Sequence, residues 1–122
     1  MRTDSPVSQL YIYRDMECIA EKSWESGRTL ARDLLSEITE LCKGASISIN
    51  ELDGVLCYQG PGSFTGLRIG ITVCNTVAYA GNLPIVGETG ENWLDLGLAK
   101  LTSGHTDEII APAYGSEPHI TL

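Results

Sequence analysis

The sequence predicts an α/β fold, and three segments support that prediction. Residues 7–22 alternate apolar and polar side chains on either side of a polar turn, which is typical of a β-hairpin. Residues 27–43 place apolar side chains at helical spacing, with charged residues on the opposite side. Residues 54–86 read as a strand, a glycine-rich loop, a helix and a second strand, a unit whose crossover should be right-handed.

The C-terminal third is expected to add a helix over residues 91–101, where apolar positions again follow helical spacing. Residues 108–111 (Glu-Ile-Ile-Ala) predict a last edge strand. Residues 112–122 show no regular pattern, and we expect them to form an irregular tail.

The composition limits the classes of protein to consider. At 122 residues the chain has room for about one domain with one modest core. No apolar run is long enough to span a bilayer and the first residues lack a secretory signal, so the cytoplasm is the expected location. The net charge of −8 disfavours direct nucleic-acid binding. The four cysteines, Cys18, Cys42, Cys57 and Cys74, have no metal-type spacing and are expected to be reduced core residues.

The helix expected over residues 67–80 is apolar around most of its circumference. Arg68 is the only charged residue between positions 54 and 87. A helix that is apolar nearly all round must be covered nearly all round, because each large apolar side chain left in water forfeits roughly 1.5–3 kcal/mol. One small sheet cannot supply that cover, so we expect a partner surface to do so.

The loop before this helix admits two interpretations from its glycines. Gly60, Gly62 and Gly66 lie between a strand and a helix, with Glu88 after the next strand, which is the outline of a dinucleotide site. The spacing differs from the commoner dinucleotide motif, and Pro61 removes one amide donor. A tight strand-to-helix turn, in which Ser63 or Thr65 caps the helix, is the structural alternative.

A longer stretch that includes this loop is more specific than its glycine content. It comprises eleven consecutive residues: Gly60, Pro61, Gly62, Ser63, Phe64, Thr65, Gly66, Leu67, Arg68, Ile69 and Gly70. This stretch resembles the signature of the TsaB family, also called YeaZ. Residues 23–28, 51–55 and 83–87 resemble the family in matching order, so the likeness covers roughly residues 9–100.

The resemblance implies a ribonuclease-H-like or actin-like (ASKHA) lobe, in which a mixed sheet carries packed helices. It also implies a non-catalytic subunit that activates the transferase TsaD, which forms threonylcarbamoyladenosine beside the anticodon of tRNA. We therefore expect no catalytic residue, no cofactor, no metal, no membrane binding and no direct tRNA binding. The expected partner is a TsaD-like subunit, with a TsaE-like ATPase as a further partner and a homodimer as the alternative when the chain is alone.

The partner contacts implied by the resemblance lie on two helices, at residues 27–43 and 64–80, which in the family pack against equivalent helices of TsaD. The expected contact residues are Leu30, Leu34, Ile38, Phe64, Leu67, Arg68, Ile71, Cys74, Asn75 and Ala78. For Arg68, an ion pair across this interface competes with a partner inside the chain's own fold.

The chain departs from the family pattern at both ends. Family members usually open with an apolar strand that runs into Asp-Thr-Ser, whereas residues 1–5 here read Met-Arg-Thr-Asp-Ser. Full-length members also continue into a second lobe. We therefore expect residues 1–122 to form a single N-terminal lobe with a shortened first strand. A protease label has been attached to the family, but no Ser, Cys and His set has suitable spacing, and neither His105 nor His119 has a Glu, Asp or Cys at metal-ligand spacing.

Overall fold

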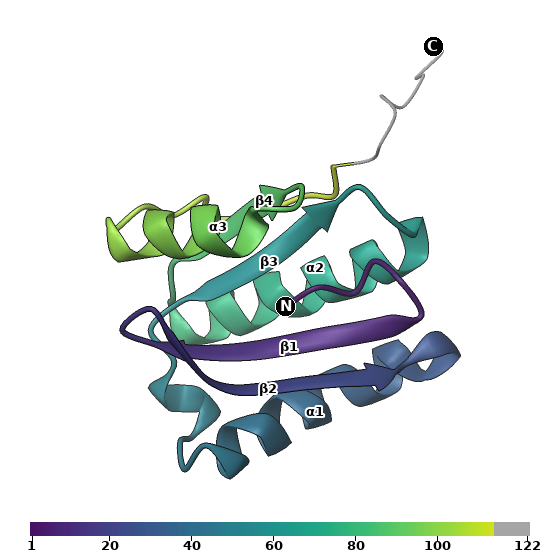
Figure 1. Cartoon of the computed structure of the whole chain (residues 1–122), viewed down its shortest axis with the longest axis horizontal. Coiled ribbons are helices and arrows are strands. Elements are labelled where there is room, and N and C mark those ends of the chain that lie inside the picture. Colours follow the sequence, from purple (N-terminus) through teal and green to yellow (C-terminus); the bar gives the residue numbers. More distant parts are fainter. Residues whose placement is uncertain (114–122) are drawn as a thin grey trace.

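The computed structural model describes residues 1–113 (Figure 1). Its elements in chain order are β1 (Val7–Arg14), β2 (Glu17–Glu25), the 3-10 turn η1 (Gly27–Thr29), α1 (Leu30–Gly44), the 3-10 turn η2 (Ile49–Glu51), β3 (Val55–Gly60), α2 (Phe64–Gly81), β4 (Ile85–Thr89) and α3 (Trp93–Thr102). The α/β class is confirmed.

The predicted hairpin is confirmed. β1 and β2 pair antiparallel from Val7 opposite Glu25 to Arg14 opposite Glu17. The turn residues Asp15 and Met16 have φ values of 51° and 69°, as a two-residue hairpin turn requires. β2 is longer than predicted, because its alternation continues through residues that the sequence pattern left unassigned.

The strand–helix–strand unit is also confirmed. β3 and β4 pair parallel, with Val55 opposite Ile85, and α2 connects them. Asn82 follows α2 in the left-handed conformation with φ of 52°, and its N–H bonds back to the last turn, which ends the helix. α3 then runs over nearly the range predicted for it.

Residues 1–4 join the hairpin to the parallel pair. Arg2 pairs antiparallel with Gln9 of β1. On the other side the Met1 nitrogen donates to the Leu56 carbonyl at 2.6 Å, and the Tyr58 N–H donates to the Met1 carbonyl at 2.9 Å. This second pattern is parallel. The strand order is therefore β2, β1, residues 1–4, β3, β4, a mixed arrangement whose central member pairs over only a short length.

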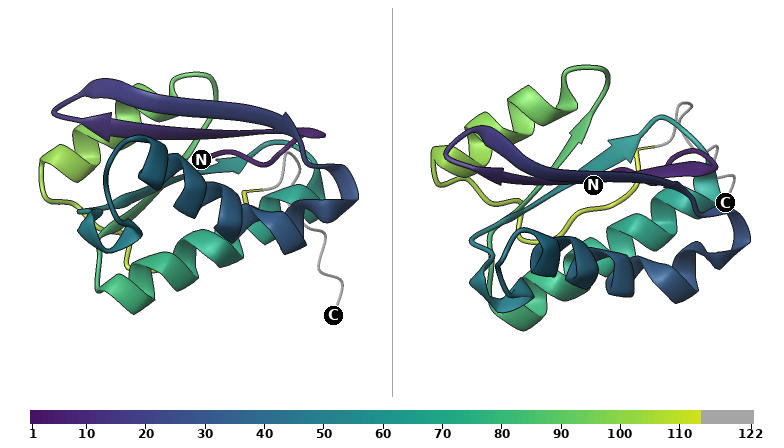
Figure 2. Two further views of the ribbon diagram at one scale, coloured as in Figure 1. Left: turned by 90° about the horizontal axis from the view of Figure 1, so that it is seen from below. Right: turned by 60° about the horizontal axis from the view of Figure 1, so that its bottom comes forward.

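Helices cover both faces of this sheet. α1 and α2 lie side by side on one face, and α3 lies on the other (Figure 2). Leu34 of α1 and Leu67 of α2 are fully buried, and Ile69 and Val73 of α2 pack against the buried stripe of α1. None of the helices within residues 1–113 is long and apolar enough to cross a membrane.

The predicted edge strand over residues 108–111 is wrong. This segment forms no strand, because its hydrogen bonds are made with side chains and not with the backbone of a neighbouring strand. Asn75 of α2 donates to the Ile110 carbonyl at 2.9 Å and accepts from the Ile110 N–H at 3.0 Å. Nearby, Thr106 and Asp107 hold the edge of β4. Of the irregular tail predicted over 112–122, residues 114–122 lie outside the described residues.

The cysteine prediction is confirmed for three positions. Cys42, Cys57 and Cys74 are buried free thiols, but Cys18 is exposed on β2. Cys18 lies at the start of β2 next to the hairpin turn, where residues 14–18 are all exposed.

Candidate docking surface and signature loop

The glycines of the signature loop allow residues 3 and 4 to cross the start of α2. A Cβ atom on Gly66 would overlap the Thr3 carbonyl oxygen, and one on Gly70 would overlap the Thr3 hydroxyl. A Cβ atom on Gly62 would overlap Asp4. Only glycine permits so close an approach of two backbone segments.

Hydrogen bonds fix this crossing. Thr3 is 2% exposed, and its hydroxyl donates to the Gly66 carbonyl at 2.7 Å. The N–H of Ser63 donates to the Asp4 carbonyl at 2.8 Å. Ser63 stands at the N-cap of α2, as predicted, but its side chain makes no capping hydrogen bond. The packing of residues 3 and 4 thus accounts for Gly62, Gly66 and Gly70 without a bound phosphate, whereas Gly60 has a φ of 127° and lies against the Ala113 carbonyl.

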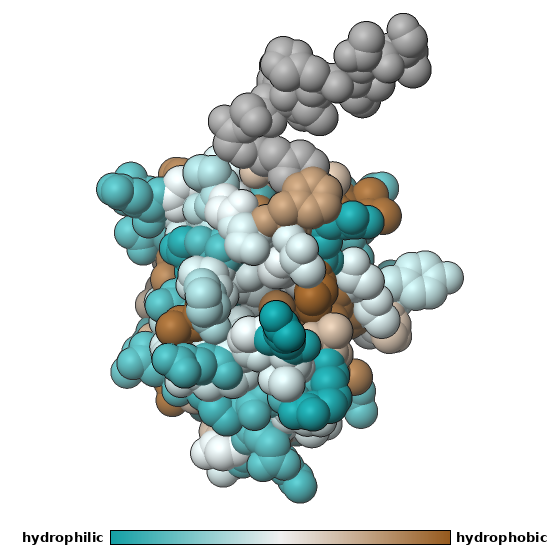
Figure 3. All heavy atoms as spheres, turned by 90° about the vertical axis from the view of Figure 1, so that its right-hand side faces the viewer, coloured by the Kyte–Doolittle hydropathy of each residue, from teal (hydrophilic) through white to brown (hydrophobic). Residues whose placement is uncertain are grey.

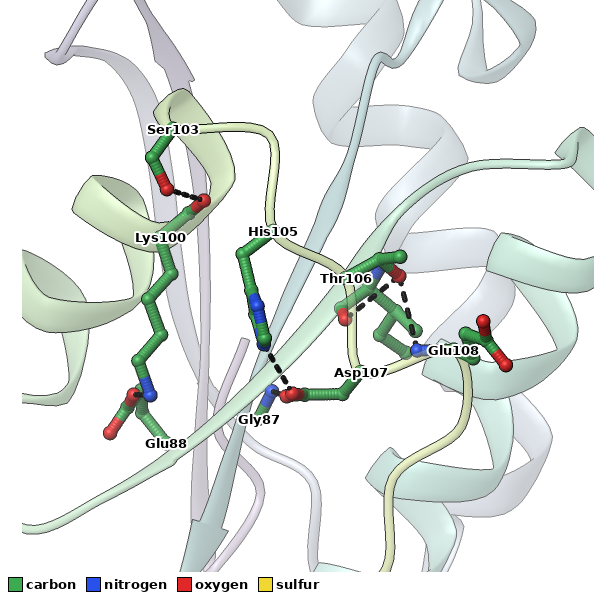
Figure 4. A network of polar contacts seen from close by, with 9 residues as sticks. Gly87, Glu88, Lys100, Ser103, His105, Thr106, Asp107 and Glu108 are labelled. Carbon is green, nitrogen blue, oxygen red and sulfur yellow. Dashed lines mark hydrogen bonds and ion pairs between the residues drawn. The ribbon is translucent and has the colours of Figure 1, made fainter.

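The other residues of the suggested dinucleotide site are also accounted for by contacts and chemistry within the chain. The Ser63 amide already has its acceptor, and Pro61 has no N–H to donate. Glu88, the acidic residue suggested for a ribose, faces the ammonium of Lys100 across an ion pair (Figure 4). These contacts favour the structural interpretation of the loop.

Most of the expected partner contacts lie inside the chain's own core. The structure buries seven of the ten, each at most 9% exposed: Leu30, Leu34, Ile38, Leu67, Ile71, Cys74 and Ala78. The sheet and the neighbouring helix cover these side chains, so they are not available to a partner on the folded chain. We do not retain them in the docking surface.

The outer face of α2 is less apolar than the sequence predicts. Thr65, Thr72 and Thr76 are exposed along it, while most of its apolar residues turn toward the sheet or toward α1. The expectation that α2 must be covered nearly all round is therefore wrong. The threonines are small and polar and tolerate contact with water, so this face of α2 needs no cover.

Three large apolar side chains are nevertheless exposed on the two helices. Leu35 of α1 is 54% exposed, and on α2 Phe64 is 51% and Tyr79 is 91% exposed. We call these three residues the helix-face anchors. Leu35 and Tyr79 were absent from the expected contacts, although their positions beside the buried stripe would have placed them at the rim of each helix.

Arg68 and Asn75, two further expected contacts, differ in their surroundings. Arg68 is exposed, and its guanidinium lies 5.3 Å from the centre of the Phe64 ring. Within residues 1–113 it forms no ion pair with a carboxylate. Asn75 is half-buried and uses its amide to hold Ile110. Seen from the end where α2 begins, the apolar surface is scattered among hydrophilic side chains (Figure 3).

A polar network holds the chain after α3 against β4 (Figure 4). One carboxylate oxygen of Asp107 accepts from the Gly87 N–H at 2.9 Å, and the other lies 2.7 Å from His105 Nε2. The Gly87 hydrogen bond, supported by His105, holds the pKa of Asp107 below its usual range although burial opposes it. No group of three or more metal-ligand side chains gathers anywhere in residues 1–113.

Comparisons with known proteins identify the family. A family model described as TsaD, tRNA N6-adenosine threonylcarbamoyltransferase, matches residues 24–89, more than half of the chain. The Haemophilus influenzae protein named tRNA threonylcarbamoyladenosine biosynthesis protein TsaB is 32% identical over 59 residues, which are 48% of this chain and 25% of that protein. Its Buchnera aphidicola namesake is 32% identical over 75 residues, 62% of this chain and 33% of that protein.

A catalytic relative and solved structures match as well. The tRNA N6-adenosine threonylcarbamoyltransferase of Listeria monocytogenes is 42% identical over 50 residues, covering 41% of this chain and 14% of that protein. YeaZ from Pseudomonas aeruginosa has a TM-score of 0.68 at 23% identity, over 84% of this chain and 47% of that chain. A second Pseudomonas aeruginosa structure, described as similar to the peptidase YeaZ, has a TM-score of 0.67 at 24% identity, over 72% of this chain and 40% of that chain.

The class of protein follows from the sheet order, the helices and these structural neighbours: the fold is an α/β lobe of the actin-like (ASKHA) type. The chain belongs to the family whose model is described as TsaD, tRNA N6-adenosine threonylcarbamoyltransferase, and proteins named TsaB and YeaZ are among those that it resembles. It spans a quarter to a third of the length of the TsaB relatives it matches, and less than half of the YeaZ structures.

Proposed function

We propose that this chain is a non-catalytic subunit that binds and activates a TsaD-like transferase in the formation of threonylcarbamoyladenosine on tRNA. In this proposal the chain is the N-terminal lobe of a TsaB-like subunit. Its docking surface is the outer side of α1 and α2, and the chemistry belongs to the partner.

The observation that carries the proposal is the set of helix-face anchors. Leu35, Phe64 and Tyr79 lie on the two helices and are each at least half exposed. Tyrosine and arginine are enriched among the residues that dominate the free energy of protein association, and large apolar side chains gain free energy when a partner removes them from water. Arg68 lies beside Phe64 and can pair with a carboxylate of the partner.

The net charge of the chain also supports a role in which the partner, not this chain, binds the tRNA. Sixteen acidic residues against eight basic ones repel the phosphates of tRNA. Thr3 and Asp4 occupy the space beside glycines of the signature loop, the conspicuous motif of the sequence. Binding of tRNA and transfer of the threonylcarbamoyl group therefore fall to the TsaD-like partner in this proposal.

The test compares two variants of the anchors with a matched control. Tyr79→Glu and Leu35→Glu place a charge on the docking surface, and each is expected to weaken binding of the TsaD-like subunit from the same source at least about tenfold, equivalent to about 1.4 kcal/mol. Leu96→Glu changes a side chain that is 50% exposed on α3, on the opposite face, and should leave the affinity unchanged.

Calorimetry with the purified subunits measures these affinities, and circular dichroism checks each fold. Folded Tyr79→Glu and Leu35→Glu proteins that bind as tightly as the unchanged chain would overturn the docking surface. Light scattering of the chain alone tests for a homodimer through the same helices, and addition of a TsaE-like ATPase tests for the further partner. Titration with ATP, ADP and NAD tests the nucleotide-binding alternative, for which docking predicts no tight binding by the isolated chain.

A further inference from the structure

The strand β2 forms one margin of the sheet. It pairs with β1 along one edge, and in the part of the chain that the structure describes no strand pairs with its other edge. Figure 1 shows β2 beyond β1, at the end of the row of strands. An unpaired strand edge presents a row of N–H and C=O groups to which another extended segment can bond. We call the unpaired side of β2 the open edge.

The register of the hairpin shows which backbone groups point to the open edge. Both backbone groups of Gln9 in β1 bond to Arg2, away from β2. Because these directions alternate along an antiparallel pair, Ser23, which lies opposite Gln9, also points away from its partner strand. By the same alternation Glu21 and Glu25 direct their N–H and C=O groups to the open edge. Within residues 1–113 no backbone hydrogen bond occupies the groups of these three residues.

Two carboxylates flank the open edge on the solvent face of β2. Glu21 and Glu25 are exposed, and neither forms an ion pair within residues 1–113. Four strand residues separate them by about 13 Å. The nearest cation in sequence, Lys22, lies on the other face of the strand and pairs with Glu37 of α1. The solvent face of the open edge is therefore acidic.

The opposite face of the open edge carries apolar side chains beside that neutralised ion pair. Ala20 and Trp24 are half-buried and pack against the buried stripe of α1. In a segment added to the open edge, the residues opposite Lys22 and Trp24 would lie on this face, because side chains alternate along a strand. Apolar residues fit these two positions.

A second copy of the chain does not fit the open edge. A symmetric antiparallel pair of β2 strands centred on Ser23 places Glu21 of each copy opposite Glu25 of the other, and like charges directly opposite each other destabilise a sheet. The chain's own basic residues do not fit either. Of the eight, only Arg28 and Arg32 are four positions apart, and they lie in η1 and α1. The charge that complements the open edge therefore points to another protein.

We propose that the open edge of β2 binds an extended basic segment of a partner protein, in which two Lys or Arg residues four positions apart lie opposite Glu21 and Glu25. The segment pairs antiparallel, the more stable arrangement per residue, with a polar residue opposite Ser23 and apolar residues at the two positions between. Backbone pairing supplies affinity, and the two carboxylates select the charge. The open edge is separate from the outer side of α1 and α2, so this site does not depend on the proposed docking surface.

The test uses a soluble peptide, acetyl-Thr-Lys-Val-Thr-Val-Lys-Thr-amide, and amide hydrogen exchange read by nuclear magnetic resonance. At saturating peptide the exchange of the Glu21, Ser23 and Glu25 amides is expected to slow by about tenfold or more, because each gains a hydrogen-bond partner. The Lys22 and Trp24 amides face β1 and serve as the internal reference, whose exchange should change far less. The same peptide with an N-methyl group on the central threonine loses a ladder bond and should bind at least about tenfold more weakly.

Charge variants provide the second control. The double variant Glu21→Gln, Glu25→Gln should bind the peptide at least about tenfold more weakly. The double variant Glu40→Gln, Glu91→Gln removes two exposed carboxylates elsewhere and should bind it as the unchanged chain does.

Three results would overturn the proposal. The first is unchanged exchange of the open-edge amides at saturating peptide. The second is equal binding of the N-methyl peptide, or equal affinity of the two double variants. The third is slowing of the same amides at high protein concentration without peptide, which would assign the open edge to a second copy of the chain.

Discussion

The position of Thr3 shows why the signature loop needs glycines better than any residue within the loop does. Its backbone occupies the space beside Gly66 and its hydroxyl lies where a side chain on Gly70 would be. The sequence shows that a turn is present between strand and helix, because the glycines and Pro61 indicate it. It cannot show which segment requires the glycines, because that segment lies 63 residues away.

Substitution of Gly66 tests this explanation. Gly66→Ala is expected to lower the free energy of unfolding by about 1–3 kcal/mol, because the new methyl group overlaps the Thr3 carbonyl, a backbone atom that cannot rotate away. Gly44→Ala is the matched control, since no atom lies within 4 Å of a Cβ there. The control should be neutral or stabilise the chain by up to about 1 kcal/mol. Urea unfolding measures both, and equal effects would contradict the explanation.

At the scale of the element, helical spacing identified the buried stripe of α1 and α2 but not what covers it. The family resemblance implies partner contacts at Leu34 and Leu67, yet the chain's own sheet and helices bury them. The same period describes both situations, so periodicity alone cannot distinguish them. The strand predicted at residues 108–111 is wrong for a different reason. The amide of Asn75 makes the hydrogen bonds that a neighbouring strand would have made.

Removal of that amide should release the segment. Asn75→Ala is expected to cost about 1–3 kcal/mol of stability, because the N–H and C=O of Ile110 lose their partners beside the core. Hydrogen exchange of Ile110 should accelerate accordingly. Thr76→Ala, the adjacent exposed position whose hydroxyl bonds only within α2, should change stability by less than about 0.5 kcal/mol. An Asn75→Ala protein that matches the Thr76→Ala protein would contradict this role.

For the whole molecule, the class, the hairpin, the parallel unit and α3 could be predicted, because each depends on neighbours close in the sequence. The family could be recognised from eleven residues for the same reason. The docking surface could not be assigned to residues such as Tyr79, because exposure depends on how the helices rotate against the sheet. The role of residues 1–4 could not be predicted either, because so short a segment shows no hydrophobic periodicity.

The stability of the whole molecule should depend on Asp107 in acid. Its pKa is held low in the folded chain, first by the Gly87 N–H and then by His105, against the effect of burial. The folded pKa lies below the unfolded value of about 3.9, so this stabilisation is complete above about pH 5 and is lost as pH falls through the folded pKa. In Asp107→Asn, the free energy of unfolding should therefore fall less steeply between pH 5 and pH 2. Parallel curves for the two proteins would refute the assignment.

The crossing of residues 1–4 through the centre of the sheet has a consequence for biosynthesis. Met1 pairs with Leu56, 55 positions along the chain, and Thr3 bonds to Gly66. On the ribosome these first residues emerge before either partner exists, so they must wait unpaired until β3 and the start of α2 have left the exit tunnel. Closure of such distant contacts is the slow part of folding, because the loop entropy is lost before the contacts form. Residues 1–4 are translated before both of their partners and are therefore among the last to reach their final positions.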